Sequence, residues 1–192
     1  MVIVGVCSSS GRESIRAFQS QLRSEQEVVV KFIELPYNNL DAYRLKRDCA
    51  DKVILCHSIH NRRFAITDVV DSLYDKFLNH AKGTFGKENV AVIAHDFPQP
   101  ESGDGEARKR LTKVRMASFH IKQPTTFQCT DLALTCGKLD TVVDIDNGDW
   151  LQVKRFLTRS RQTGGDLSSS STVIIQIYKD NIALASYPPD NL

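Results

Sequence analysis

Short apolar runs alternate along this chain with segments that have the period of a helix. The runs are rich in valine and isoleucine, several lack strict alternation, and they cover residues 2–7, 28–35, 52–59, 90–94 and 126–129. Runs of this kind are typical of strands that are covered on both faces of a parallel sheet. We therefore predict an α/β fold, a three-layer, doubly wound, mostly parallel sheet.

Three helices are predicted after the first one. The clearest has Gly83 and Gly86 after its end and places one apolar face on Ile66, Val69, Val70, Leu73, Phe77 and Leu78. A second helix should run from Glu106 to Ile121, end before Pro124, and bury Leu111, Val114 and Ile121.

The pattern changes near the last helix. Asp149 is its expected N-cap, Gly164 and Gly165 should stop it, and its apolar residues are Leu151, Phe156 and Leu157. We therefore divide the whole chain into an α/β domain over 1–161, a polar linker over 162–171, a β-hairpin over 172–187 and a tail over 188–192. We expect the hairpin to pack on the same domain, or to pair two copies of the chain.

Composition excludes several classes. The 192 residues are 41% hydrophobic and 25% charged, which is ordinary for one globular domain. No run approaches the roughly 20 apolar residues of a membrane span. The five cysteines are scattered and odd in number, which favours a reducing compartment, so a cytoplasmic or nuclear protein away from membranes is expected.

The first loop is the strongest candidate for binding an anion. Small and polar residues follow the first strand and lead into a helix; the candidate ligands are Gly5, Ser8, Ser9, Ser10, Gly11, Arg12 and Ser14. Backbone N–H groups can approach a phosphate in such a loop, and a helix N-terminus adds partial positive charge. The spacing departs from a Walker loop, because five residues separate the glycines and Arg12-Glu13 stands where lysine is required.

From Val2 to Leu157 the layout resembles a Ras-like small GTPase domain without switch I and its following strand. Residues 30–44 occupy the place of the DxxG motif and second switch, 52–69 that of the fourth strand and its helix, and 90–96 that of the strand ending in NKxD. Glu34 and Tyr37 replace the Asp and Gly of DxxG, and Ala94-His95-Asp96 replaces NKxD. The resemblance implies a degenerate, noncatalytic module that scaffolds other proteins and uses no cofactor.

Flavodoxins offer a second resemblance through Ser8-Ser9-Ser10-Gly11. Their strand order, 2-1-3-4-5, suits the same segments and is the order we predict. An aromatic residue to stack on the flavin is missing after Ile59 and after Ile93. A phosphate, nucleotide or FMN binder that uses the loop from Gly5 to Ser14 is therefore kept as an alternative.

Polar residues also follow the predicted strands and should gather at one edge of the sheet. The cluster consists of His57, His60, His95, Asp96, Cys129 and Asp131. Such residues can bind Zn²⁺ or transfer protons, but no CxxC or HxxxH spacing is present, so we predict neither a metal site nor a catalytic group.

Basic residues concentrate on two predicted helices: Arg108, Lys109, Arg110, Lys113 and Arg115 on one, and Lys154, Arg155, Arg159 and Arg161 on the other. The net charge is only +2 and no aromatic residues interleave. Another protein is therefore the expected partner rather than nucleic acid, with an acidic partner or nucleic acid on this surface as the remaining alternative.

Overall fold

The computed structural model describes residues 1–61, 64–100 and 105–159, and its Met1–Arg159 unit contains a sheet of five parallel strands. The strands are β1 (Val2–Ser8), β2 (Val28–Glu34), β3 (Lys52–Ser58), β4 (Val90–His95) and β5 (Leu132–Thr135). Their order is β2-β1-β3-β4-β5, which confirms the predicted topology. The predicted linker, hairpin and tail lie outside the described residues.

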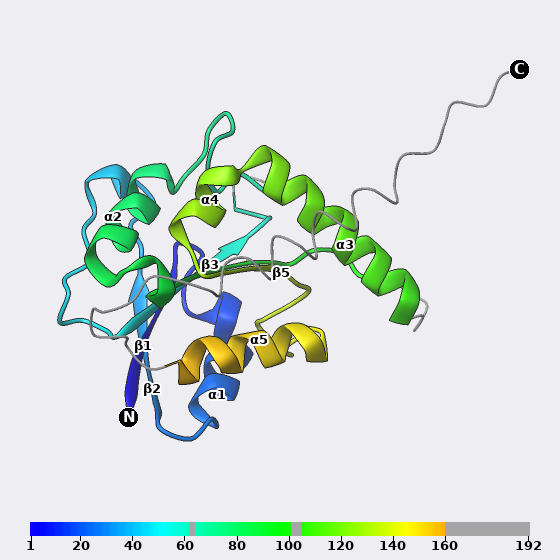
Figure 1. The fold of residues 1–192 in the computed structure, drawn as a ribbon, viewed down its shortest axis with the longest axis horizontal. Coiled ribbons are helices and arrows are strands. Elements are labelled where there is room, and N and C mark those ends of the chain that lie inside the picture. The colour runs from blue at the N-terminus through cyan, green and yellow to red at the C-terminus, as the bar shows by residue number, and fades with distance from the viewer. Residues whose placement is uncertain (62–63, 101–104, 160–192) are drawn as a thin grey trace, which may run out of the picture. The chain divides into compact units, whose positions relative to one another are not determined.

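Helices cover both faces of the sheet and make three layers (Figure 1). One face carries α1 (Arg16–Arg23) and α5 (Asn147–Thr158); the other carries α2 (Asp75–Phe85), α3 (Gly105–Lys122) and α4 (Pro124–Cys129). Short 3-10 turns cover Glu13–Ile15, Leu40–Ala42 and Lys87–Asn89. Alternate residues of β3 supply the two cores, since Leu55 packs towards α2 and Ile54 towards α1 and α5.

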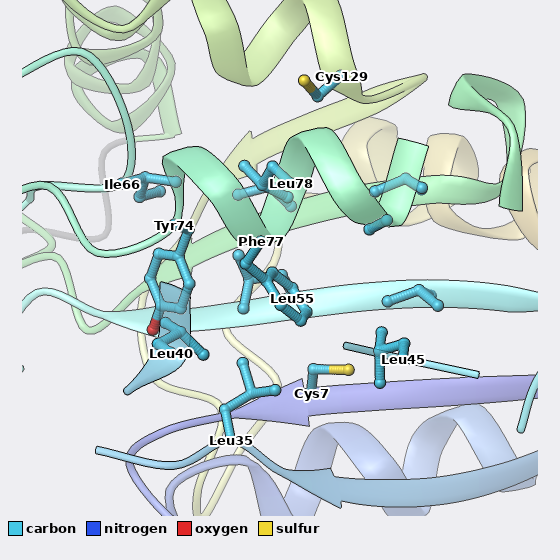
Figure 2. Packing of buried hydrophobic residues seen from close by; sticks show 14 of the residues in the cluster. Cys7, Leu35, Leu40, Leu45, Leu55, Ile66, Tyr74, Phe77, Leu78 and Cys129 are labelled. Atoms are coloured by element: carbon cyan, nitrogen blue, oxygen red, sulfur yellow. The ribbon is translucent and has the colours of Figure 1, made fainter. Parts of the chain in front are cut away.

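The core under α2 is the larger of the two. Figure 2 shows Phe77 pointing from α2 towards Leu55 of β3, and Leu78 and Cys7 of β1 belong to the same buried cluster. The Phe77 ring lies 6.2 Å from that of Tyr74, and both side chains are fully buried. Aromatic groups of this size account for much of the apolar surface that folding removes from water.

The helix predicted from Ile66 to Leu78 begins later than its apolar pattern. Asp68 and Asp71 adopt positive φ angles of 63° and 62°, so the chain before Tyr74 is irregular and the helix begins at Asp75. Val70 is 89% exposed rather than buried. Gly83 lies inside α2, and only Gly86 follows its end. The pattern was misread because buried residues of an irregular segment happened to fit a period of 3.6.

The predicted strand over 126–129 is wrong. Pro124 opens α4 at its first turn, where the missing N–H of proline costs nothing, and the helix runs to Cys129. The edge strand β5 begins only at Leu132. A four-residue apolar run carries too little periodicity to distinguish a buried strand from a buried helix.

The predicted second helix exists as α3, but its buried face was assigned to the wrong side. Leu111, Val114 and Ile121 are 39%, 68% and 77% exposed. Phe119 is buried against the core instead, with Met116 packed beside it. The aliphatic residues of α3 therefore face outwards.

The N-cap of the last helix lies three residues before the predicted one. The Asp146 carboxylate accepts a hydrogen bond of 2.8 Å from the Gly148 N–H, so Asp146 and not Asp149 caps α5. The helix ends at Thr158, and its predicted stop at Gly164 and Gly165 lies outside the described residues. Phe156 and Leu157 are buried as predicted, whereas Leu151 is exposed.

Asp146→Ala should lower the free energy of unfolding by about 1 kcal/mol, because it removes the acceptor for a helix N–H. Asp149→Ala is the matched control and should cost less. Burial, followed by the neighbouring charge of Asp146, raises the pKa of Asp149, so ionised Asp149 is disfavoured in the fold. Urea denaturation of both variants checks this, and an equal loss would contradict the assignment of the cap.

The cysteines behave as small apolar residues. Cys7, Cys56, Cys129 and Cys136 are buried and all five thiols are free. Burial raises the pKa of the Cys7 and Cys56 thiols, which keeps them protonated and unreactive. Within the described part of the chain, none of the helices has the length and apolar character that crossing a membrane requires.

Candidate functional site

Gly5, the first glycine of the predicted phosphate loop, lies inside β1, opposite Lys31 of β2 and Val53 of β3. A Cβ atom at Gly5 would come within 2.8 Å of Ile33 Cδ1 and 3.2 Å of Ala50 Cβ. The glycine is required for close packing between strands rather than for approach to an anion. The true loop therefore begins after Ser8.

The loop hydroxyls bind other parts of the protein. Ser9 Oγ lies 2.8 Å from the Tyr74 hydroxyl and accepts a second hydrogen bond, also of 2.8 Å, from the Asn61 amide. Ser8 Oγ accepts from the Ser10 N–H at 3.1 Å, and Ser14 Oγ donates to the Gly11 carbonyl at 2.8 Å. Only Ser10 Oγ is buried without a hydrogen-bond partner among the loop side chains that the structure describes.

The charges at the loop do not favour an anion. The Arg12 guanidinium lies 5.3 Å from the centre of the Phe32 ring on β2, which is a cation–π contact. Glu13 opens the 3-10 turn that follows and pairs with Arg16 at 3.5 Å. The Glu13 carboxylate therefore lies at the start of the helix and would repel an anion. The Arg12 guanidinium contacts the Phe32 ring.

The predicted strand-end cluster divides between opposite edges of the sheet. His57, His95 and Asp96 lie at the carboxyl ends of β3 and β4, as predicted. Asp131 precedes β5 and its N–H binds the carbonyl of Val90 at the start of β4, so it lies at the amino edge, as does Cys129 before it. Cys129 and Asp131 were expected at the carboxyl edge because a strand was predicted over 126–129, where the structure has a helix.

Asp96 is the centre of the residues that do converge. Ser58 Oγ donates to Asp96 Oδ2 at 2.5 Å, and His95 Nδ1 lies 3.1 Å from the same oxygen. His57 contacts Tyr74 instead, with Nδ1 3.4 Å from the hydroxyl. In a hydrolytic triad the histidine lies between the carboxylate and the serine. Here the carboxylate lies between them, so His95 cannot take the Ser58 proton.

Backbone hydrogen bonds fix the loops around Asp96. The Ile59 N–H binds the His95 carbonyl at 3.1 Å, and the Asp96 N–H binds the Gly137 carbonyl at 2.9 Å. Asp96 has a φ of 68°, a left-handed conformation that few residues other than glycine adopt. The carboxyl ends of β3, β4 and β5 are thus tied into one rigid edge.

The contacts of Asp96 predict a dependence of stability on pH. Burial acts to raise its pKa, but the His95 ring nitrogen beside the carboxylate and the hydrogen bond from Ser58 outweigh burial and lower it. A depressed pKa stabilises the fold above the unfolded value of about 3.9, and this contribution is lost as the pH falls through the folded value. The stability advantage over Asp96→Asn should therefore be complete above about pH 5 and shrink as the pH falls below about 3.9.

Urea denaturation across that pH range measures the effect. Ser58→Ala provides the second variant, because removing one donor should raise the pKa of Asp96 and move the loss of stability to higher pH. An unchanged pH profile in both variants would contradict the role of this cluster.

A cavity of about 440 Å³ opens beside Asp96 at the carboxyl edge. It is lined by His60, Asp96, Phe97, Pro98, Gln99, Lys138, Val142 and Asp144. Phe97 carries the Arg115 guanidinium on its ring at 4.1 Å, and Arg108 pairs with Asp144. No residue from Ser8 to Ser14 lines this cavity, so the first loop and the hollow do not form one nucleotide site.

Sequence reasoning missed several residues of this region. Ser58 is the last residue of β3 and Asn61 lies three residues beyond it, so the rule that ligands bind at strand ends points to them as strongly as to the histidines. Phe97 follows Asp96 in the same way. Tyr74 could not be found in this way, because it does not follow a strand. The irregular segment before α2 brings it to the first loop.

Within the described residues, no three His, Cys, Asp or Glu side chains are grouped so that they could hold a metal ion. The sequence matches no protein-family model and no curated protein. The strand order is compatible with the resemblance to small GTPases and with that to flavodoxins, so it does not discriminate between them.

Proposed function

We propose that this chain is a noncatalytic, GTPase-like interaction module that binds other proteins and neither binds nor hydrolyses GTP. The observation that carries the proposal is the Ser9–Tyr74–Asn61 contact, which uses the central hydroxyl of the first loop to hold neighbouring elements together. A loop that binds triphosphate must offer its donors to the ligand.

Charge supports the same proposal. Triphosphate binding in P-loop proteins needs an ammonium group at the β- and γ-phosphates and a hydroxyl on Mg²⁺. In this chain Arg12 stacks on Phe32, Glu13 adds like charge, and the Ser14 hydroxyl donates to the loop backbone. The unpartnered Ser10 hydroxyl offers a single neutral donor, which cannot offset the charge of a triphosphate.

Isothermal titration calorimetry of the full chain with GTP, GDP and Mg²⁺ tests the proposal. We expect no saturable heat at millimolar nucleotide. Submicromolar binding would overturn the proposal and favour the alternative, a nucleotide or FMN binder that uses the loop from Gly5 to Ser14. In that event Arg12→Ala should weaken binding, whereas Arg16→Ala, one turn further on, serves as the matched control.

A further inference from the structure

Helix α3 carries a row of outward-facing residues at heptad spacing. Leu111, Val114 and Ile121 are exposed, and Ala107 and Ser118 occupy the intervening positions of the same row. The steps along the row are four, three, four and three residues, which is the spacing of a seam that packs against one partner helix. We call these five residues the α3 seam.

The seam lies on the side of α3 opposite the core. Phe119 is 1% exposed and packs with Met116 against the large core, so the helix is already anchored by its other face. Figure 1 shows α3 meeting α4 at its C-terminal end and extending away from α4 towards its first residues. The aliphatic side chains of the seam are therefore not needed to hold α3 on the domain.

Basic residues border the seam on both sides. In a heptad the positions that flank the seam decide which partner is accepted, and four of the five flanking positions of α3 are Arg108, Arg110, Arg115 and Lys122. The helix has six basic residues and one acidic residue, whereas the whole chain has a net charge of only +2. The charge is therefore concentrated beside the seam.

Two of these flanking cations are available to a partner. Arg108 pairs with Asp144, and Arg115 lies over the Phe97 ring. Arg110 and Lys122 are exposed and have no ion-pair partner within the described ranges. They lie near opposite ends of the seam, so a partner must be acidic along its length.

We propose that the α3 seam binds a single amphipathic helix of a partner protein whose apolar row is flanked by acidic residues. This inference rests on the proposed role as an interaction module and names the surface and the chemistry of the partner. Ala107 and Ser118 leave space for large apolar side chains of that helix, and Leu111, Val114 and Ile121 fill the space between its turns.

The same observations disfavour the other occupants. A second copy of α3 would carry the same mostly basic flanking positions, so like charges would gather along the seam. Nucleic acid gains nothing from Leu111, Val114 and Ile121, because phosphate is bound by polar and charged groups. A membrane-surface helix uses a broad apolar face, whereas the large exposed apolar residues of α3 form only a narrow row of Leu111, Val114 and Ile121.

The test uses the full chain and a fluorescent peptide of three heptads with Ile at a, Leu at d and Glu at e and g. We expect saturable binding by fluorescence anisotropy, with a Kd in the micromolar range. The same peptide with Lys at e and g should not bind. Failure of the acidic peptide, or equal binding of both peptides, would overturn the proposal.

Variants assign the binding to the seam. Leu111→Glu combined with Val114→Glu should weaken binding at least about tenfold, which corresponds to about 1.4 kcal/mol. Leu151→Glu combined with Val70→Glu makes the same chemical change at exposed positions elsewhere and should leave binding unchanged. Arg110→Glu combined with Lys122→Glu should reverse the preference in favour of the Lys peptide.

Four further measurements distinguish other occupants. Binding to phosphatidylserine vesicles or to duplex DNA that the seam variant loses would assign the face to a membrane or to nucleic acid. Dimerisation by sedimentation equilibrium that the seam variant abolishes would assign it to a second copy. Slow maleimide labelling of Val114→Cys in the full chain would show that the face is already covered. Each of these results would overturn the proposal, and none depends on whether GTP binds.

Discussion

Gln123→Leu should destabilise the fold by about 3 kcal/mol or more, although leucine is close in size to glutamine. The side chain is 2% exposed and joins the α3–α4 junction to the irregular segment before α2. Its Oε1 accepts from the N–H groups of Ile66 and Thr67 at 2.8 and 3.0 Å, and its Nε2 donates to the Phe64 carbonyl at 2.9 Å.

The size of the effect follows from the groups left behind. The substitution leaves two N–H groups and one carbonyl without hydrogen-bond partners in a buried site. Each unsatisfied group costs about 1–3 kcal/mol. Gln128→Leu is the matched control, since Gln128 is exposed on α4 and its replacement should change stability by less than about 0.5 kcal/mol. Equal denaturation midpoints for the two variants would refute the assigned role of Gln123.

Phe77→Ala should lower the free energy of unfolding by about 3–5 kcal/mol, because it leaves a cavity in the larger core. The ring is fully buried, lies 6.2 Å from Tyr74 and 6.4 Å from Tyr43, and packs towards Leu55 (Figure 2). Part of the cost is the lost free energy of transferring the ring from water to the core. The rest is the cost of the cavity, which the neighbouring aromatic rings are too rigid to fill.

Urea denaturation at neutral pH measures this loss. Val70→Ala is the control, since Val70 precedes the same helix, is 89% exposed and should contribute less than about 0.5 kcal/mol. A loss below about 1 kcal/mol for Phe77→Ala would mean that the core under α2 is not packed as described.

The fold was predictable because the central strands are buried on both faces. The apolar runs of β1, β3 and β4 favour strands of a parallel sheet, and the strand order was predicted from the resemblance to flavodoxins. The buried face was predicted wrongly for α3, a helix that is buried on one side only. The aliphatic residues of α3 are spaced like a core face, and nothing in one sequence says that Phe119 on the other side is preferred.

The candidate site was predictable only in part. The loop after β1 and the residues Asp96 and His95 were found from their places after strands. The decisive contacts were not, because Ser9, Asn61 and Tyr74 come from three separate segments. Tyr74 reaches the loop only because Asp68 and Asp71 break the predicted helix with positive φ angles. Local pattern cannot report a contact between side chains 65 residues apart in the chain.

The account depends on a first loop in which the hydroxyls of Ser8, Ser9 and Ser14 are already hydrogen-bonded within the protein. Its most direct test is a ¹H–¹⁵N NMR titration of the full chain with Mg²⁺-GTP and with inorganic phosphate, following the amides of Ser9, Ser10 and Gly11. The account predicts that these resonances stay in place up to millimolar ligand. Saturable shifts confined to these three amides would contradict it.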